Sequence, residues 1–520
     1  MIDPRAARPP DAVVPAQAEQ SISGDAERIV SHSLAGTRWV LWLSASALAC
    51  GFGTNVVLGR SSPALLGFYG FVTLTLSLLG IFFVLGGGNV VVNYLPKVAR
   101  EDKMGFLASY GAIVAVSSAA LLGLAAAVPA IPDLIYGDAA ETGAVRYLAL
   151  LLPVAVVQML AWSTLQADLA LRTFAVSQGL VSTVTFVGLL VAAGSGWLDG
   201  SSARTYVLGA VVAANVASIL LAVGRLWTNQ LRAWGPVRRP FLPEGFWRFS
   251  LYFHAGVMVS FAVRSLDQVY VMRELGLVSL GYYRSALVLA QLANFLLVVT
   301  DKAFYSTFCN VDEDSQPRLY SRFVRLNSVG SGLVGLVLLL FAGDLLTLFG
   351  ESATPESRTL VTLIAGAILV AFPITSVNNS LVTARERMNL IFVNNAIGAA
   401  AALVLYAWFG GRLGLVGVGW AFLALQLLML SLSSVAVRRA AGASFPVGAW
   451  AVSIAAAAVG AGAGTVLGDT SFLEVAVKGA LVAAFLPLLV VSRLVTRDEL
   501  KDLAALVVPG RWFRRTRVAT

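Results

Sequence analysis

Residues 261–286 read FAVRSLDQVYVMRELGLVSLGYYRSA and hold Arg264, Asp267 and Arg284 within an otherwise apolar part of the chain. A charged side chain near the centre of a lipid bilayer costs roughly 2.5–3.5 kcal/mol on insertion scales. Charges at such depths usually face the interior of a helix bundle or a water-filled cavity. We therefore interpret this stretch as one wall of a substrate pathway in a membrane protein.

The rest of the chain has the composition of a helical membrane protein. It is 58% hydrophobic and 12% charged over 520 residues, against roughly 25% charged in soluble domains. Apolar segments of about 20 residues recur along its whole length, and each is long enough to span a bilayer as a helix. A transmembrane β-barrel would show alternating segments of about 10 residues instead. The sequence therefore predicts an all-α polytopic membrane protein.

We expect about fourteen transmembrane helices, at 36–58, 65–93, 107–130, 146–166, 173–196, 205–226, 249–272, 279–300, 325–349, 358–382, 388–409, 413–437, 447–467 and 472–492. The expected organisation is a disordered cytosolic tail at 1–35, a first six-helix lobe at 36–226, a cytosolic linker at 227–248, a second six-helix lobe at 249–437, two further helices at 438–492 and a basic interfacial or cytosolic tail at 493–520.

The distribution of basic residues predicts the orientation. The segments on one side, including both tails, hold 28 of the 37 lysines and arginines, and those on the other side hold 7. Because basic residues accumulate in cytoplasmic loops, we expect both termini in the cytosol of a bacterial cell with the protein in its inner membrane. The same rule accounts for the formal charge of +9, so no nucleic-acid partner is expected.

An internal repeat relates the two expected lobes. LLGFYGFVTLTLSLLG at 65–80 aligns with SLGYYRSALVLAQLAN at 279–294. The offset of 214 residues matches Gly67 with Gly281 and Tyr69 with Tyr283, and places Gly70 opposite Arg284. Internal repeats are typical of secondary transporters, which bind their substrates between the repeats. The repeat therefore predicts two pseudo-symmetric lobes with charge concentrated on the second.

Several motifs resemble a known family. They are GFYG at 67–70, GGGN at 86–89, NYLPK at 93–97, Arg264-x-x-Asp267, Gly276 and GYYRSA at 281–286. They are similar to those of polysaccharide-biosynthesis flippases, which carry lipid-linked oligosaccharides such as O-antigen and exopolysaccharide units and belong to the multidrug/oligosaccharidyl-lipid/polysaccharide exporter superfamily. The resemblance implies a V-shaped pair of six-helix lobes around a cavity. It also implies flipping of a polyprenyl-pyrophosphate-linked oligosaccharide from the inner to the outer leaflet.

Candidate phosphate ligands lie on the seventh and eighth spans. Ser260, Arg264, Asp267 and Gln268 share a helical stripe, and Arg284 and Gln291 share a face of the next helix. Guanidinium groups bind phosphate oxygens bidentately with a fixed charge, so we expect Arg264 and Arg284 to bind the substrate's phosphates, with Gln268 and Gln291 beside them. Alternatively, both arginines snorkel to the outer interface. Asp267 is a candidate for ion coupling, or pairs with Arg264 at i, i+3.

The other polar residues allow two interpretations, substrate binding or a structural role. Asn55, Asn89, Asn378 and Asn379 offer the donors and acceptors that sugar hydroxyls need, but Asn in a membrane bundle also makes interhelical hydrogen bonds. Lys97, Arg100 and Lys103 would gather an anionic lipid headgroup at the inner leaflet, or serve only as topology determinants. The glycines at 460–464 fit small-residue helix packing.

No catalytic constellation, cofactor site or metal site is expected. The chain has no GxxxxGK[ST], HExxH or CxxC pattern, and its two cysteines, Cys50 and Cys309, lie in or at the end of apolar segments. We expect a transporter and not an enzyme. Membrane lipids and the lipid-linked oligosaccharide are the expected partners, with polymerase or chain-length machinery of polysaccharide export as a further candidate, and a monomer is expected.

Two groups of alternatives stay open. Within transporters they are a peptidoglycan lipid-precursor flippase and a cation-coupled multidrug exporter, although an exporter of that kind would be expected to hold more acidic residues in its spans than Asp267. A membrane glycosyltransferase or polymerase is a different class, and it would be expected to use large outer loops. The longest outer loop expected here, near 132–145, is short.

Overall fold

The computed structural model describes residues 43, 45–83, 88–127, 144–168, 170–237, 239–293, 304–305, 308, 313, 315–467 and 472–491. Within these residues the chain forms helices and no strand. The predicted tails at 1–35 and 493–520, most of the loop at 132–145, and Cys309 lie outside the described residues.

The helices follow the predicted order of spans, and each predicted span overlaps at least one of them. In the first half of the chain they are 45–61, α2 (Pro63–Phe83), α3 (Gly88–Tyr94), α4 (Lys103–Ala127), α6 (Ala144–Ala167), α7 (Leu171–Gly194) and α8 (Ala203–Leu226). A linker follows, with a π-helical turn η2 (Trp227–Leu231) and the short α9 (Arg232–Trp234).

In the second half they are α10 (Phe246–Tyr270), η3 (Val271–Leu275), α11 (Gly276–Leu292), α13 (Gln316–Leu340), α14 (Ala342–Thr347), η4 (Gly350–Ser352), α15 (Pro355–Ala384), α16 (Met388–Leu405), η5 (Tyr406–Gly410), α17 (Gly411–Ala441), α18 (Val447–Val466) and α19 (Phe472–Val491).

The all-α membrane fold is confirmed. Ten helical segments of the described residues are long and apolar enough to cross a membrane, by length and composition. Two of them, Phe246–Leu292 and Met388–Ala441, run for 47 and 54 residues, so each is long enough for two spans. The chain is therefore a multi-pass membrane protein.

The two repeated helices cross each other at the glycines that the repeat matches. A Cβ atom on Gly67 of α2 would lie 1.9 Å from the carbonyl oxygen of Leu277, and one on Gly281 of α11 would lie 2.0 Å from that of Pro63. Leu277 and Pro63 are themselves separated by 214 residues. The crossing of α2 and α11 is thus pseudo-symmetric, and only glycine allows such a close approach of the two backbones.

Further contacts join the two halves of the chain on the predicted outer side. The Arg60 guanidinium donates a hydrogen bond from Nε to the Leu348 carbonyl oxygen at 2.8 Å. The Phe52 and Phe349 rings pack edge to face with centroids 5.7 Å apart. In this conformation the two halves are therefore packed together at their predicted outer ends.

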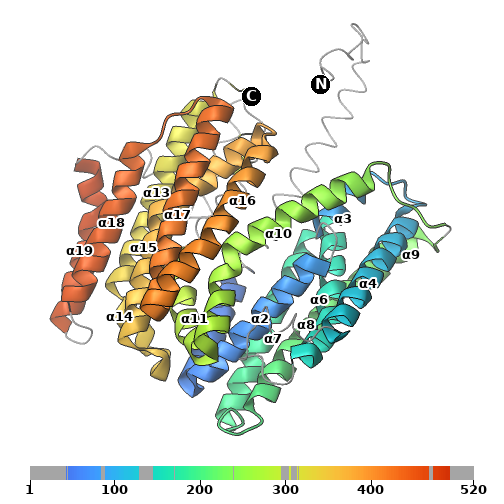
Figure 1. Ribbon diagram of the computed structural model, residues 1–520, viewed down its shortest axis with the longest axis horizontal. Coiled ribbons are helices and arrows are strands. Elements are labelled where there is room, and N and C mark those ends of the chain that lie inside the picture. The colour runs from blue at the N-terminus through green and yellow to red at the C-terminus, as the bar shows by residue number, and fades with distance from the viewer. Residues whose placement is uncertain are drawn as a thin grey trace.

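The long helix α10 connects the two groups of helices (Figure 1), where it runs from beside α3 and α9 down to α11. At its start Phe246 is buried among the rings of Tyr94, Phe106 and Tyr110. Edge-to-face and offset aromatic contacts of this kind are favourable beyond the area that they bury. The first turn of α10 is thus anchored on helices of the predicted first lobe.

Of the last two helices, α18 packs against α13 and α15 and α19 packs against α13, at the far end of the molecule from α4 (Figure 1). Cβ atoms on Gly460 and Gly464 of α18 would lie 2.8 Å and 2.5 Å from atoms of Leu339 in α13. This is the small-residue packing expected for that glycine-rich stretch. Polar contacts add to it, because Arg358 donates to the Gly464 carbonyl oxygen at 2.7 Å.

Candidate functional site

Two adjacent polar pairs hold α10 against α11. The Tyr283 hydroxyl donates to Asp267 Oδ2 at 2.5 Å, and Arg284 Nη1 donates to Gln268 Oε1 at 3.2 Å. Because Asp267 and Gln268 are neighbours in the sequence, their side chains leave the helix about 100° apart. Gln268 lies with Arg284 at the junction of the two halves of the chain, whereas Asp267 is buried within the second half.

The Arg284 side chain reaches across this junction into the first half of the chain. Its Nε donates to Asn55 Oδ1 at 3.3 Å, and its guanidinium carbon lies 5.4 Å from the centre of the Tyr69 ring. A Cβ atom on Gly70 would be 2.8 Å from Arg284 Cδ. The first half therefore lacks a side chain at the repeat position of Arg284, and this leaves the space that the Arg284 side chain occupies.

The partners of Arg284 are all neutral. Among the described residues no carboxylate forms an ion pair with its guanidinium, which is bonded by two side-chain amides and faces a tyrosine ring. Guanidinium groups form their strongest hydrogen bonds with anionic oxygens. The structure brings the predicted residues Arg284, Gln268 and Asn55 together as one cationic cluster with unused capacity for an anion.

Asp267 has a different environment. It is 2% exposed, and in the described part of the chain its Oδ1 atom has no hydrogen-bond partner. The Tyr406 hydroxyl, on the neighbouring η5, is also buried without one. The alternative pairing with Arg264 is not formed, because Arg264 is exposed on α10 and the Asp267 carboxylate bonds Tyr283 instead. Two residues of the predicted helical stripe thus differ in environment, because Arg264 is exposed and Asp267 is buried.

The other predicted polar ligands do not join the cluster. Asn89 on α3, Gln291 at the end of α11 and Asn379 on α15 are exposed. Asn378 is fully buried and bridges three helices, since it accepts from the Tyr320 hydroxyl at 2.7 Å and donates to Ser433 Oγ at 2.9 Å. For Asn378 the geometry is that of interhelical packing.

Asn378→Ala is expected to lower stability without changing substrate preference. The substitution leaves the buried Tyr320 hydroxyl without its acceptor, whereas Ser433 keeps its bond to the Leu430 carbonyl oxygen. An unmet buried group costs about 1–3 kcal/mol. Thermal unfolding of the purified variant in detergent measures this change. Asn379→Ala is the matched control because Asn379 is exposed. Equal unfolding temperatures for the two variants would contradict the structural role.

The three basic residues expected to gather headgroups lie around one loop. Lys97 is exposed and donates to Asn93 Oδ1 at 2.7 Å, and Arg100 donates to the Ala233 carbonyl oxygen at 3.2 Å. The Lys103 ammonium lies 5.2 Å from the centre of the Trp234 ring. Two of the three residues therefore contact the linker between the two halves of the chain.

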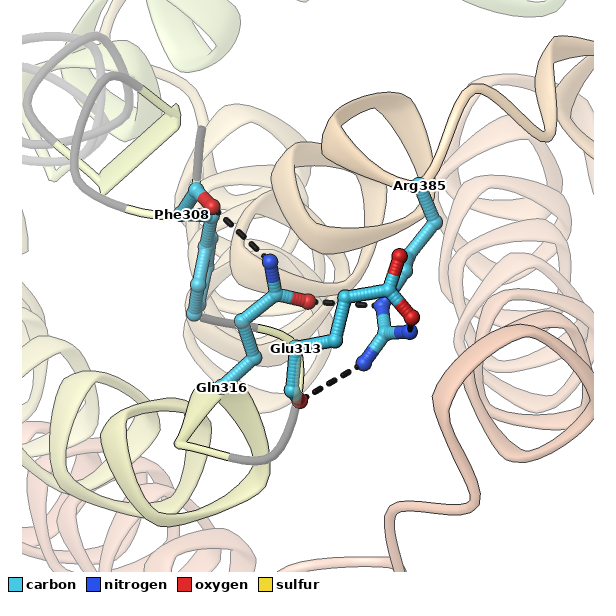
Figure 2. Close-up of polar contacts among 4 residues, drawn as sticks. All are labelled: Phe308, Glu313, Gln316 and Arg385. Atoms are coloured by element: carbon cyan, nitrogen blue, oxygen red, sulfur yellow. Dashed lines mark hydrogen bonds and ion pairs between the residues drawn. The ribbon is translucent and has the colours of Figure 1, made fainter. Parts of the chain in front are cut away.

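Sequence reasoning missed a polar network at the predicted cytosolic end of the second half. Arg385 bonds Gln316 Oε1 at 2.6 Å, the Glu313 carboxylate, and the Glu313 carbonyl oxygen at 2.8 Å, and Gln316 donates to the Phe308 carbonyl oxygen at 2.9 Å (Figure 2). In the sequence, Arg385 is one of the basic residues on the predicted cytosolic side. The network fixes the chain ahead of α13 to the end of α15.

The roles of Tyr69 and Tyr283 were also missed, although the repeat had aligned the two residues. One faces the guanidinium of Arg284 and the other bonds Asp267. The described residues hold no group of three or more His, Cys, Asp or Glu side chains placed to bind a metal ion.

Comparison with known proteins identifies the family and the fold. Residues 61–351 match the family described as "Polysaccharide biosynthesis protein". No curated protein matches the sequence.

Solved structures of low sequence identity share the fold. A structure described as "Lipid II flippase MurJ, inward closed conformation" is 14% identical with a TM-score of 0.68, over 87% of this chain and 100% of that one. An inward-facing multidrug resistance MATE family transporter of the MOP superfamily is 13% identical with a TM-score of 0.57, over 76% and 94%. A MOP superfamily transporter from Pyrococcus furiosus is 12% identical with a TM-score of 0.54, over 79% and 94%.

Proposed function

This chain belongs to the family of polysaccharide biosynthesis proteins, and we propose that it flips a polyprenyl-pyrophosphate-linked oligosaccharide from the inner to the outer leaflet of a bacterial inner membrane. The flipped unit would then serve cell-surface polysaccharide export. The protein would work by alternating access, with both termini in the cytosol and as a monomer. Its family and its transporter-like fold support this proposal.

The observation that carries the proposal is the Arg284 cluster. A guanidinium inside a membrane protein is costly unless it is compensated, and here its hydrogen-bond partners are the neutral amides of Asn55 and Gln268. A pyrophosphate would replace these neutral acceptors with anionic ones, which bind roughly twice as strongly. The cluster therefore suits a substrate that arrives with its own negative charge.

The conformation supports loading from the inner leaflet. At the predicted outer side the two halves are joined by the α2–α11 crossing and by the bond from Arg60 to Leu348. While the outer side is closed, the protein would shield the substrate's phosphates from hydrocarbon. This shielding is needed because burial of an uncompensated charge in lipid is prohibitive. Asp267, with its unpaired Oδ1, is the candidate for ion coupling in this cycle.

The family description favours a polysaccharide precursor over other substrates. A lipid-linked peptidoglycan precursor is the second candidate, because the chain shares its fold with a lipid II flippase over 87% of its length. Both substrates carry a pyrophosphate, so the Arg284 cluster serves either. A cation-coupled drug exporter is less well supported, because an exporter of that kind would be expected to hold more acidic residues in its spans than Asp267.

Reconstitution tests the proposal. Proteoliposomes holding a fluorescent polyprenyl-pyrophosphate oligosaccharide are expected to show protein-dependent movement of the lipid between leaflets, measured with a membrane-impermeant quencher. A fluorescent lipid II assayed in parallel separates the two substrate classes. Absence of movement of either lipid under pH, sodium and potential gradients would overturn the flippase proposal.

Arg284→Gln is expected to reduce the translocation rate about 100-fold, because charge-assisted hydrogen bonds contribute about 1.5–3 kcal/mol each. Arg284→Lys keeps the charge and loses the bidentate geometry, so a partial loss of about tenfold is expected. Arg412→Gln is the matched control, since Arg412 is exposed and stacks on Trp408. Wild-type rates for Arg284→Gln at equal expression would refute phosphate binding at this residue.

A further inference from the structure

The linker between the two halves of the chain is folded onto the first turns of α4 and the loop before that helix. A Cβ atom on Gly105 would lie 2.3 Å from the Arg239 carbonyl oxygen, and the Phe241 backbone N–H donates to Ser109 Oγ at 3.0 Å. Arg100, in the loop before α4, donates a hydrogen bond to the Ala233 carbonyl oxygen. These contacts give the linker a defined outer surface.

That surface is basic and aromatic. Four arginines are exposed on the linker and on the helix turns that flank it, namely Arg225, Arg232, Arg239 and Arg248. On the same segments, Trp227 and Trp247 are 57% and 51% exposed. Lys97 and Arg100 are exposed on the neighbouring loop, and Arg100 bonds the Ala233 carbonyl oxygen of the linker.

Nearby carboxylates neutralise only part of this charge. Asp102 pairs with Arg239 at 3.5 Å, and Asp168 accepts a hydrogen bond from Gln230. In the part of the chain that the structure describes, Arg225 and Arg232 have no carboxylate partner. Glu244 on the linker and Glu101 on the neighbouring loop are exposed as well. Six basic side chains against four carboxylates leave this surface with a net positive charge.

The position of this face indicates its ligand. It joins the last turn of α8 to the first turn of α10, and both turns are predicted to lie at the cytosolic surface of the membrane. Trp side chains concentrate at the level of the lipid headgroups, and the inner leaflet carries anionic lipids that attract basic residues near the surface. Exposed tryptophans interleaved with arginines therefore fit a headgroup layer better than bulk solution.

We propose that the linker surface, defined by Arg225, Trp227, Arg232, Arg239, Trp247 and Arg248, binds the headgroups of anionic phospholipids in the inner leaflet. The arginines contact the phosphates, and the indole rings lie among the glycerol and upper acyl regions. The surface is separate from the Arg284 cluster, and its lipid binding does not depend on which substrate is transported.

Native mass spectrometry of the purified full-length protein tests this proposal with phosphatidylglycerol and phosphatidylcholine. The wild-type protein is expected to bind phosphatidylglycerol more tightly, and 0.5 M salt is expected to weaken that binding by screening. Each interfacial arginine contributes roughly fivefold. Arg225→Gln/Arg232→Gln should therefore raise the dissociation constant for phosphatidylglycerol about 25-fold, and Trp227→Ala should raise it for both lipids.

The control variant is Arg438→Gln/Arg439→Gln, which removes two exposed arginines from the predicted cytosolic end of α17. It is expected to bind phosphatidylglycerol as the wild-type protein does. Equal affinity of the wild-type protein for the two lipids, or an equal loss in both double variants, would overturn the proposal. Displacement of the lipid by an equal concentration of inorganic phosphate would identify a free anion as the ligand, and would also overturn it.

Discussion

Gly67→Ala is expected to prevent the outer ends of the two halves from closing and to abolish transport. The added Cβ would lie 1.9 Å from the carbonyl oxygen of Leu277. The obstacle is backbone, so no rotamer change relieves the clash, and α2 must move away from α11. Gly281→Ala should have the same effect, because its Cβ would lie 2.0 Å from the Pro63 carbonyl oxygen.

The separation of the helices can be measured directly. In a background with Cys50 and Cys309 replaced by serine, Ser62→Cys is placed beside the crossing and labelled with a membrane-impermeant maleimide. Labelling is expected to rise several-fold in Gly67→Ala and Gly281→Ala. Gly209→Ala on α8 is the control, since a Cβ there has no atom within 4 Å. Normal labelling and normal transport in both crossing variants would show that the crossing does not close the outer side.

The combination of the two glycine substitutions adds a further expectation. The two contacts are related by the pseudo-symmetry of the repeat, and each alone separates the same pair of helices. Once α2 has moved away from α11, the second Cβ meets little further resistance. The effects of Gly67→Ala and Gly281→Ala on labelling should therefore be less than additive, as is expected for neighbouring residues that share one structural change.

Asp344→Asn is expected to destabilise the protein by about 3–5 kcal/mol, the range measured when one partner of a buried ion pair is removed. Lys478 on α19 is fully buried, and its ammonium bonds Asp344 at 2.8 Å with the Phe341 ring 5.3 Å away. Without the carboxylate, a buried ammonium would face only an amide and an aromatic ring. The pair would then no longer hold α19 against the helix pair α13–α14.

Substitution of the other partner of this ion pair should cost less stability. Lys478→Met leaves Asp344, whose side chain is 26% exposed, with access to water or headgroups. The double variant Asp344→Asn/Lys478→Met should recover most of the lost stability, because replacing both charges removes the unpaired ion. Unfolding in detergent at increasing temperature or denaturant measures all three variants.

An exposed pair provides the control for these variants. Arg273 and Glu274 are bonded at 3.1 Å with side chains 43% and 49% exposed. Exposed pairs contribute about 0–1 kcal/mol, so Glu274→Gln should change stability little. Equal losses for Asp344→Asn and Lys478→Met would show that burial of the lysine does not determine the energetics.

Much of the fold followed from simple physical limits on a chain in lipid. A spanning segment must be apolar, about 20 residues long and internally hydrogen-bonded, so hydropathy alone located most of the helices to within a few residues. The exception is the span predicted at 325–349, because α13 runs from Gln316 to Leu340. The internal repeat relates individual positions of the two halves of the chain. It matches Gly67 with Gly281, and only the structure shows that at both positions a helix approaches another backbone closely.

The candidate site was less accessible to sequence reasoning. A helical period places Arg264, Asp267 and Gln268 on neighbouring faces, but it does not say which face another helix covers. In the structure α11 covers Asp267 and Gln268 and leaves Arg264 exposed. Likewise Asn378 and Asn379 are adjacent in the sequence, yet one is buried between three helices and the other is exposed.

The sequence by itself determined the membrane-spanning helices, their order, the repeat and the residue types that a phosphate requires. Only the tertiary structure decided which of those residues meet. Arg284 and Asn55 are bonded across 229 residues of chain, and Arg358 reaches Gly464 across 106. Such contacts depend on how each helix is rotated and shifted against its neighbours, and that is set by the packing of the whole bundle and not by any local pattern of residues.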